Sequence, residues 1–445
     1  MISPIESSIN HHRNQLAYDD GKIQIQYGSL QAAVAESAIT QLTNIDFGDY
    51  IAWSPENDFE SFLTFWTLQQ RGCVTCPISS RISNSKRCEM AKQINAKWLK
   101  AIPNSKDKVQ HKFVNSETHD DPNQPATLIF SSGSTGQPKA IVHAMSAHIA
   151  SAAGAAEIIP LESGDRWLWS LPLYHISGLS ILIRCATAGA TVVGLPVDQK
   201  LNAHVLDKLK VTHLSVVATQ LRRLLTEKTF PSQHLRTVLL GGSLVDPKLV
   251  ETARNRGIDV RTTYGLSEMA SQVTTSPANG TPKASGKLLK HRQLQLSASG
   301  EILVRGETLA LGYFQNGGIQ PLINQDGWFQ TNDIGALNEN SELIVSGRID
   351  NMFISGGENI HPENIERAMT SLFNIEQVIV VPSQDKEFGS RPVAFVDGRL
   401  PPNWKEKITR LLPKYEVPVE IHPWPSGADT EIKPNRIHLQ RLISD

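Results

Sequence analysis

Nine consecutive residues, Ser131 to Lys139, combine hydroxyl side chains, two glycines and one lysine in a pattern that suits a phosphate chain. Glycine lets the backbone approach a ligand closely, and successive backbone N–H groups in such a turn form a concavity that binds anions. The hydroxyl groups add hydrogen-bond donors, and the lysine adds a positive charge. An exposed turn is the alternative interpretation. The predicted phosphate-binding residues are Ser131, Ser132, Gly133, Ser134, Thr135, Gly136 and Lys139.

A close-approach turn and two carboxylates lie further along the chain. Gly241-Gly-Ser243 follows a strand-like run, and its backbone could lie against a flat base. Glu268 ends the run Tyr264-Gly-Leu-Ser-Glu268, where its carboxylate is a reasonable ligand for Mg²⁺, an ion that prefers oxygen. Asp333 could accept two hydrogen bonds from a ribose diol. The alternatives are an ordinary turn for the glycines, a solvated surface position for Glu268 and an Asx-type turn for Asp333.

Arg184 is a charge in an otherwise apolar run that begins after His175 and is expected to be a helix. Charge inside a buried helix costs free energy unless it is paired. Ser177, Ser180 and Arg184 are spaced to share one helical face. In one interpretation this face lines a pocket and the guanidinium group binds a carboxylate through two hydrogen bonds. The other interpretations are an internal salt bridge and an arginine whose charged end reaches water.

Length and charge limit the classes of function. The chain has 445 residues, which is too long for one ordinary core, so two or more domains are expected. Lys and Arg number 43 against 44 for Asp and Glu, so no basic excess points to nucleic acid or to an anionic membrane. No apolar run reaches the length of a membrane span, about 18 residues, and the N-terminus lacks the apolar core of a signal peptide.

Cys73 and Cys76 form a Cys-x-x-Cys pair, but no second pair completes a four-cysteine zinc site. Their surroundings favour a buried strand in which cysteine is a small apolar residue. Few cysteines and no export signal predict a cytoplasmic location.

Apolar spacing predicts the elements that position these residues. Alternating helices and strands predict an α/β fold with a largely parallel sheet. A β-rich stretch begins at Gly300, and a compact α+β unit follows Asp350, with a helix that begins at Pro362. We expect a domain boundary at 347–351, which gives units 1–348 and 349–445. Helices are expected at 27–42, 59–71, 146–158 and 404–412, and strands at 49–53, 216–219, 237–243, 259–263, 378–381 and 393–396.

The motifs and their order resemble the adenylate-forming superfamily, which includes acyl-CoA synthetases and the adenylation domains of peptide synthetases. The matching set is the Ser131 loop, Gly241-Gly-Ser243, Tyr264 to Glu268, Thr331-Asn-Asp333, Gly347-Arg348, Gly356-Gly357, Ile360 to Glu363, and Lys433. This resemblance implies a large N-terminal domain of βα-layered sheets plus a small β-barrel-like part. A small, mobile α+β C-terminal domain would be joined to it by a hinge at Asp350.

The resemblance also implies roles for the matching residues. ATP would contact the Ser131 loop and a second set of residues, Mg²⁺ would bind Glu268, and Lys433 would be the C-terminal catalytic lysine. Three positions depart from the usual motifs: Ser267 replaces threonine, Asn332 replaces glycine, and Glu431-Ile-Lys433 replaces the usual Gly-Lys. The second set of ATP-binding residues comprises Gly241, Gly242, Ser243, Tyr264, Gly265, Ser267, Asp333 and Arg348.

Within the superfamily, Pro172 to Gly178 followed by Arg184 looks most like the 2-succinylbenzoate–CoA ligases of menaquinone biosynthesis. His175, Ser177, Arg184 and Thr263 would bind the acid, and His175 would assist catalysis. The implied reaction uses ATP, Mg²⁺ and coenzyme A to convert a carboxylic acid through an acyl-adenylate into a thioester. The alternatives are an aryl- or fatty-acyl–CoA ligase, a carrier-loading adenylation enzyme and a silent nucleotide-binding protein. Assembly as a homo-oligomer is left open.

Overall fold

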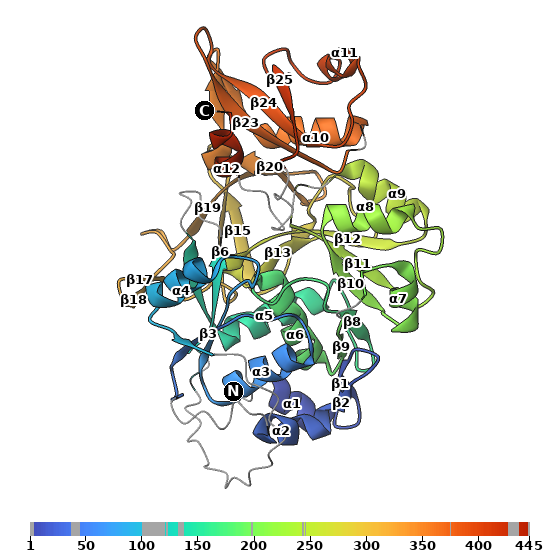
Figure 1. The fold of residues 1–445 in the computed structure, drawn as a ribbon, viewed down its shortest axis with the longest axis vertical. Helices are drawn as coiled ribbons and strands as arrows, with labels where there is room; N and C mark the ends of the chain where they lie inside the picture. Colours follow the sequence, from blue (N-terminus) through green and yellow to red (C-terminus); the bar gives the residue numbers. More distant parts are fainter. Residues whose placement is uncertain are drawn as a thin grey trace.

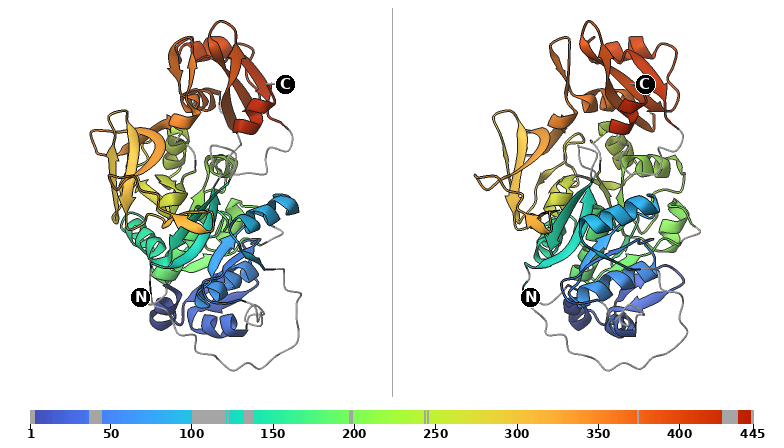
Figure 2. Two further views of the ribbon diagram at one scale, coloured as in Figure 1. Left: turned by 90° about the vertical axis from the view of Figure 1, so that its left-hand side faces the viewer. Right: turned by 60° about the vertical axis from the view of Figure 1, so that its left-hand side comes forward.

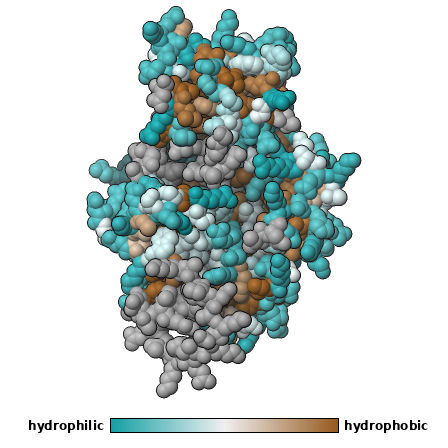
Figure 3. All heavy atoms as spheres, in the orientation of Figure 1, coloured by the Kyte–Doolittle hydropathy of each residue, from teal (hydrophilic) through white to brown (hydrophobic). Residues whose placement is uncertain are grey.

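The computed structural model describes residues 4–36, 45–99, 121, 123–131, 138–196, 199–242, 244, 246–373, 375–425 and 436–443. A large unit contains most of the chain, and a smaller unit built from the residues after Arg348 sits at one end of the long axis (Figures 1 and 2). Apolar side chains gather on the visible face of the smaller unit, whereas polar side chains predominate below it (Figure 3). Within the described ranges, no helix is long and apolar enough to cross a bilayer.

The described residues form a nine-stranded sheet in the order β14-β13-β12-β11-β10-β8-β9-β1-β2. The six central strands, β12, β11, β10, β8, β9 and β1, pair in parallel. Strands β2, β13 and β14 pair antiparallel at the two edges of the sheet. The prediction of a largely parallel sheet is therefore confirmed for its centre. The bounds are β1 Leu16–Asp19, β2 Gln24–Gln26, β8 Arg166–Leu168, β9 Thr191–Val193, β10 His213–Val216, β11 Thr237–Leu240, β12 Asp259–Leu266, β13 Ser271–Thr275 and β14 Lys287–Leu288.

A second sheet in the described ranges has seven strands in the order β18-β17-β7-β6-β4-β3-β5. Cys73 and Cys76 are buried and free, and Cys76 lies in β4, as predicted for an apolar strand. The bounds are β3 Tyr50–Trp53, β4 Val74–Pro77, β5 Lys97–Trp98, β6 Pro125–Ser131, β7 Lys139–Ala144, β17 Gly312–Gln315 and β18 Gly318–Gln320.

Helices with apolar faces share a hydrophobic cluster with strands of both sheets. The faces of α3, α5 and α6 supply many of its buried side chains, among them Phe65, Trp66 and Leu182. Helix α6 ends where Gly189 takes a φ of +66°, a conformation that glycine adopts without steric cost. The helices of the large unit are α1 Pro4–His11, α2 Tyr27–Glu36, α3 Phe59–Gln70, α4 Asn84–Gln93, α5 Met145–Ala156, α6 Ile176–Ala188, α7 Ala203–Lys208, α8 Ala218–Thr226 and α9 Pro247–Asn255.

One predicted strand, at 216–219, is wrong after its first residue. Strand β10 ends at Val216, and α8 begins at Ala218. The backbone N–H of Val217 donates to Gln220 Oε1 at 3.1 Å, so a side chain one turn ahead stabilises the start of the helix. This local hydrogen bond outweighs the β preference of Val217.

Three strands of the predicted β-rich stretch, β16, β19 and β20, form a four-stranded antiparallel sheet with β15, which precedes Gly300, whereas β17 and β18 join the seven-stranded sheet. The residues after this stretch build the smaller unit. Buried side chains of that unit, including Ile365, Met369 and Val380, form a core of their own. The sheet comprises β15 Arg292–Leu296, β16 Glu301–Gly306, β19 Phe329–Leu337 and β20 Leu343–Arg348. The smaller unit comprises β21 Phe353–Ser355, β22 Glu358–Ile360, α10 Pro362–Phe373, β23 Gln377–Asp385, β24 Gly389–Asp397, α11 Trp404–Thr409, β25 Glu420–Pro423 and α12 Arg436–Arg441.

Two solvent-exposed contacts join α8 and α9 to the smaller unit. The guanidinium group of Arg223 lies 3.1 Å from the Glu376 carboxylate, and Lys248 Nζ donates to the carbonyl of Ser371 at 2.9 Å. The side chains of Arg223 and Glu376 are 70% and 49% exposed. These contacts set one face of the smaller unit against the end of the large unit.

Candidate active site

A cleft of about 850 Å³ lies where the two units meet. Strand ends of all three sheets of the large unit reach it, and α10, β23 and α12 of the smaller unit close its other side. Most described residues of the predicted site line this one cleft, although they are far apart in the sequence. They are Ser131, Lys139, Gly242, Thr263, Tyr264, Gly265, Ser267, Glu268, Asp333, Arg348 and Asp350. Ser132, Gly133, Ser134, Thr135, Gly136, Ser243 and Lys433 lie outside the described residues.

The glycine turn after β11 provides backbone close to the cleft. Gly242 takes a φ of +86°, which favours glycine. A Cβ atom on Gly241 would lie 2.8 Å from Thr263 Cγ2, so this position has little room for a side chain. Gly241 itself does not appear among the lining residues, but its neighbour Gly242 does. The turn therefore has the small, close backbone that was expected for contact with a flat ligand.

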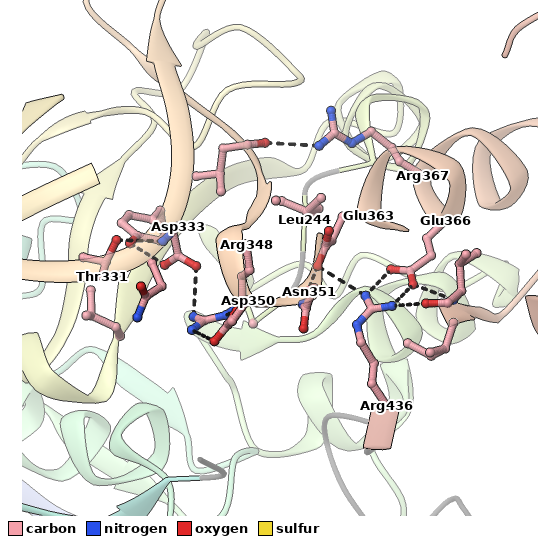
Figure 4. Close-up of a pocket in the computed structure, with 18 of the residues that line it drawn as sticks. Leu244, Thr331, Asp333, Arg348, Asp350, Asn351, Glu363, Glu366, Arg367 and Arg436 are labelled. Atoms are coloured by element: carbon pink, nitrogen blue, oxygen red, sulfur yellow. Dashed lines mark hydrogen bonds and ion pairs between the residues drawn. The ribbon is translucent and has the colours of Figure 1, made fainter. Parts of the chain in front are cut away.

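Asp333 is fixed by two donors at the junction of β19, β20 and β12 (Figure 4). Tyr264 Oη donates to Oδ2 at 2.6 Å, and Arg348 Nη1 lies 3.0 Å from Oδ1. Burial and the nearby Asp333 charge both raise the pKa of Tyr264, which keeps its hydroxyl protonated and able to donate. Asn332 has a φ of +60°, which explains why glycine suits this position and why asparagine can replace it.

Arg348 also connects this carboxylate to the predicted hinge. Its Nε and Nη2 atoms lie 2.8 Å and 2.9 Å from the two oxygens of Asp350, which is a bidentate ion pair (Figure 4). The hydrogen bond to Asp350 raises the pKa of Arg348 above its ordinary value. Asp350 lies in the 3₁₀ turn Ile349–Asn351, directly after the last strand of the large unit.

Glu268 lies half-buried in the 3₁₀ turn Ser267–Met269, at the end of β12. Tyr313 Oη donates to Glu268 Oε1 at 2.8 Å, and Lys139 Nζ lies 5.2 Å from the centroid of the Tyr313 ring. The Ser267 carbonyl is 2.6 Å from His143 Nε2, which must donate because a carbonyl only accepts. Tyr313 and His143 were missed by the sequence reasoning, since their partners come from distant parts of the chain and no spacing signals the contacts.

Glu268 alone could hold Mg²⁺ only together with oxygen ligands from a substrate. No group of three or more His, Cys, Asp and Glu side chains that could hold a metal occurs among the residues that the structure describes. Mg²⁺ is usually held by one or two carboxylates together with substrate phosphates and water. The donor set therefore suits an ion that arrives with a phosphate chain.

Arg184 is buried in α6 and is not among the residues that line the cleft. Its Nη2 atom donates to Gln272 Oε1 at 2.5 Å and to Ser271 Oγ at 3.3 Å, and its guanidinium group lies 5.3 Å from the Trp167 ring centroid. No carboxylate of the described chain lies within 4.0 Å of it, so the predicted internal salt bridge is not found in that part. Burial lowers the pKa of Arg184 to about 10. The contacts leave a buried cation with neutral partners.

His175 and Ser177 lie at the start of the same helix and, like Arg184, do not appear among the residues that line the cleft. His175 is the N-cap residue of α6, and its ring packs 4.8 Å from the ring of Tyr174. The Ser177 carbonyl accepts from Ser180 Oγ at 2.9 Å. Only Thr263 of the four predicted acid-binding residues reaches the cleft in this structure.

The smaller unit contributes an ion-pair cluster that the sequence did not predict (Figure 4). Arg436, the first residue of α12, lies 2.6 Å from Glu366 Oε1 and 3.4 Å from Glu363 Oε1. Burial opposes the charge on Arg436, but the adjacent Glu366 carboxylate holds its pKa above the ordinary value. These residues lie on α10 and α12 and line the cleft, so charged groups from both units face it.

Comparisons with known proteins show the family of this chain. Residues 85–314 match the model of a family described as AMP-binding enzyme. A 2-succinylbenzoate–CoA ligase of Haemophilus influenzae is 39% identical over 326 residues, which cover 71% of this chain and 70% of that protein. The corresponding ligase of Salmonella typhimurium is 38% identical over 333 residues, with 73% of this chain and 70% of that protein covered.

A solved structure extends the likeness to the whole chain. It is an arginine-to-lysine variant of E. coli MenE with bound OSB-AMS. The two chains are 31% identical with a TM-score of 0.88, and the match covers 100% of this chain and 99% of the other. The expected fold, with layered sheets, a smaller β part and a C-terminal α+β unit, is thereby confirmed. By its sequence, its fold and the residues gathered in its cleft, this chain belongs to the AMP-binding enzyme family.

Proposed function

We propose that this protein is an ATP-dependent ligase that activates 2-succinylbenzoate as an acyl-adenylate and transfers the acyl group to coenzyme A, a step of menaquinone biosynthesis. The observation that carries the proposal is the meeting of Lys139, Glu268 and Asp333 in one cleft. The names of the Haemophilus and Salmonella relatives, together with the OSB-AMS held by the E. coli protein, support this choice of acid.

The nucleotide would lie along the cleft from the glycine turn to the Ser131 loop. Gly241, Gly242 and Tyr264 would frame the adenine, and Asp333 and Arg348 would hold the ribose. Ser131 and Lys139, at the two ends of the phosphate loop, would bind the β- and γ-phosphates. Such positioning and charge stabilisation account for most of the rate enhancement expected in reactions at phosphorus.

Glu268 would hold Mg²⁺ together with phosphate oxygens. When bound, the ion neutralises charge that gathers on the departing pyrophosphate. The half-buried carboxylate is held by Tyr313 and by the turn that contains it, so its position is fixed before any ligand arrives.

Arg184 would supply the charge that a second substrate carboxylate requires. 2-Succinylbenzoate carries two carboxylates, of which one reacts and the other stays free. A buried guanidinium group whose hydrogen-bond partners are neutral, and which lies near the second buried cation Arg292, is suited to bind the free carboxylate, because that ligand removes the cost of an unpaired buried charge. His175 and Ser177, on the same helix, would complete this part of the site with Thr263.

The reaction would proceed in two half-reactions. A carboxylate oxygen attacks the α-phosphorus of ATP, which forms a new P–O bond and breaks the bond to pyrophosphate. The thiol sulfur of coenzyme A then attacks the acyl carbon, and AMP leaves as the C–O bond breaks. Lys433 would assist the first step, and rotation about Asp350 would exchange the faces of the smaller unit between the steps. We place the domain boundary between residues 348 and 349.

The decisive assay compares 2-succinylbenzoate with benzoate and fatty acids. Pyrophosphate release that depends on the acid, followed by thioester formation that depends on coenzyme A, is the expected result. Preference for benzoate or a fatty acid would favour another acyl-CoA ligase, and transfer only to a carrier protein would favour an adenylation enzyme. No release with any acid would favour a silent nucleotide-binding protein. The need for ATP and coenzyme A supports a cytoplasmic site of action, and assembly of copies stays open.

A further inference from the structure

We propose that Tyr313 is a positioning residue that keeps Glu268 and Lys139 apart and aims both at the nucleotide and its metal. The inference rests on the proposed function, since it gives Glu268 and Lys139 the roles described above. Tyr313 lines the cleft with them and contacts both.

The two contacts use different parts of the tyrosine. The hydroxyl donates to Glu268 Oε1 at 2.8 Å, and the ring face receives Lys139 Nζ at 5.2 Å from its centroid. A cation over an aromatic face is attracted by the ring quadrupole. The same side chain thus holds a negative group by its edge and a positive group by its face.

The frame that carries the three residues is continuous. Tyr313 on β17 is paired with Ile141 on β7, the strand that begins at Lys139. The Glu268 carbonyl accepts from the backbone N–H of Ala310 at 2.8 Å, two residues before β17 begins. A movement of β17 would therefore displace the tyrosine together with the lysine strand and the glutamate turn.

Separation of the two charges has a chemical consequence. A lysine and a glutamate in one cleft would otherwise pair with each other, and each ligand would have to break that pair. Within the part of the chain that the structure describes, no ion pair within 4.0 Å joins Lys139 to Glu268.

The Tyr313 hydroxyl also fixes the orientation of the Glu268 carboxylate by its hydrogen bond to Oε1. With Oε1 engaged by Tyr313, Oε2 is the oxygen left to face a metal ion. A bond from a neutral donor fixes the carboxylate plane without cancelling its charge, whereas a lysine contact would weaken the attraction for a cation. The phenol is thus suited to orient a metal ligand, in the way that second partners orient the ligands of other metal sites.

The test separates the hydroxyl from the ring. Tyr313→Phe removes the donor and keeps the aromatic face, whereas Tyr313→Leu removes both. Tyr50→Phe is the matched control, because Tyr50 lies on β3 of the same sheet with its ring 5.1 Å from that of Phe314. Binding of ATP is measured calorimetrically as Mg²⁺ is varied from zero, and acid-dependent pyrophosphate release is measured over the same Mg²⁺ range.

Tyr313→Phe is expected to raise the Mg²⁺ concentration for half-maximal binding roughly tenfold, the loss expected for one hydrogen bond to a charged group. The affinity of this variant for ATP without metal should stay within about twofold, because phenylalanine keeps the aromatic ring that Lys139 contacts. Tyr313→Leu should weaken metal-free ATP binding as well, by about threefold. The control should match the parent protein in both measurements.

A double-mutant cycle keeps the inference falsifiable if a variant is partly unfolded. If Tyr313 acts through Glu268, the effect of Tyr313→Phe on Mg²⁺ dependence disappears in a Glu268→Gln background. An equal effect in both backgrounds, or an unchanged Mg²⁺ dependence in Tyr313→Phe, overturns the inference. Absence of acid-dependent pyrophosphate release in the parent protein would instead overturn the proposed function, while the binding measurements would still test the tyrosine.

Discussion

The hydroxyl of Tyr264 donates to Asp333 at 2.6 Å and so joins two sheets at the floor of the cleft. Tyr264 belongs to β12 of the nine-stranded sheet, and Asp333 belongs to β19 of the four-stranded sheet. Arg348 holds the other oxygen of the same carboxylate at 3.0 Å. A neutral donor and a charged donor together fix Asp333 at the place where the proposed ribose would bind.

Replacement of Asp333 by asparagine is expected to weaken ATP binding by about tenfold to a hundredfold. The change removes a charge-assisted contact, which is typically worth about 1.5–3 kcal/mol, and leaves Arg348 facing a neutral amide in place of the carboxylate. The KM for ATP in pyrophosphate exchange measures the effect. Asp326→Asn, an exposed position in the turn before β19, is the control. An unchanged KM in Asp333→Asn would remove the residue from the nucleotide site.

Replacement of Arg184 by methionine tests the acid-binding assignment. The use of 2-succinylbenzoate should fall by about tenfold to a hundredfold, because one charge-assisted contact to the free carboxylate is lost. Benzoate, which has no second carboxylate, should be used no worse than before. Competition kinetics with both acids give the ratio, and Arg256→Met at an exposed position is the control. A parallel loss for both acids would show that Arg184 supports the fold rather than selectivity.

Replacement of Lys433 by alanine should separate the two half-reactions. Adenylate formation should be lost, because the amine would no longer neutralise charge between the carboxylate and the α-phosphate. Thioester formation from supplied acyl-adenylate should persist near the parent rate. Lys386→Ala, an exposed lysine of the same unit, should affect neither step. Equal damage to both steps in Lys433→Ala would contradict the assignment.

Two buried histidines predict a pH dependence of stability. Burial lowers the pKa of His143 from 6.5 to about 4 and that of His148 well below 6.5. Between about pH 6.5 and 4 the unfolded chain binds more protons than the folded chain, so the free energy of unfolding falls as the pH falls. The slope should reach about 1.4 kcal/mol per pH unit for each histidine.

Denaturant midpoints between pH 7.5 and 4.5 measure this dependence. The double variant His143→Gln, His148→Gln should reduce the slope in this window, to which His213, whose pKa is also lowered by burial, continues to contribute. Glutamine at position 143 keeps a donor for the Ser267 carbonyl. His204→Gln, at an exposed position, should leave the slope as it is. The histidine account fails if the double variant shows the slope of the parent protein.

The candidate site was largely predictable because its residues are marked by local patterns. Gly242 and Glu268 lie just after the ends of β11 and β12, whereas Asp333 lies within β19, and all three line one cleft. Asn332 shows why a departure from a motif can be harmless, since asparagine tolerates the left-handed backbone that glycine adopts easily.

The supporting contacts were not predictable. Tyr313 reaches Glu268 across 45 residues, and Arg436 reaches Glu366 across 70 residues. Each partner has an ordinary role when it is considered in its own segment, so only tertiary pairing reveals the contact. The strand predicted at 216–219 failed for a related reason, because the Gln220 side chain favours a helix start that β propensity does not record.

The two exposed contacts between α8, α9 and the smaller unit limit how firmly that unit is held on this side. An ion pair as open to water as Arg223–Glu376 contributes only about 0.2–1 kcal/mol and weakens in salt. Thermal energy is therefore sufficient to break the Arg223–Glu376 ion pair repeatedly. Ionic strength should accordingly change the rate of exchange between orientations of the smaller unit before it changes the affinity for any substrate.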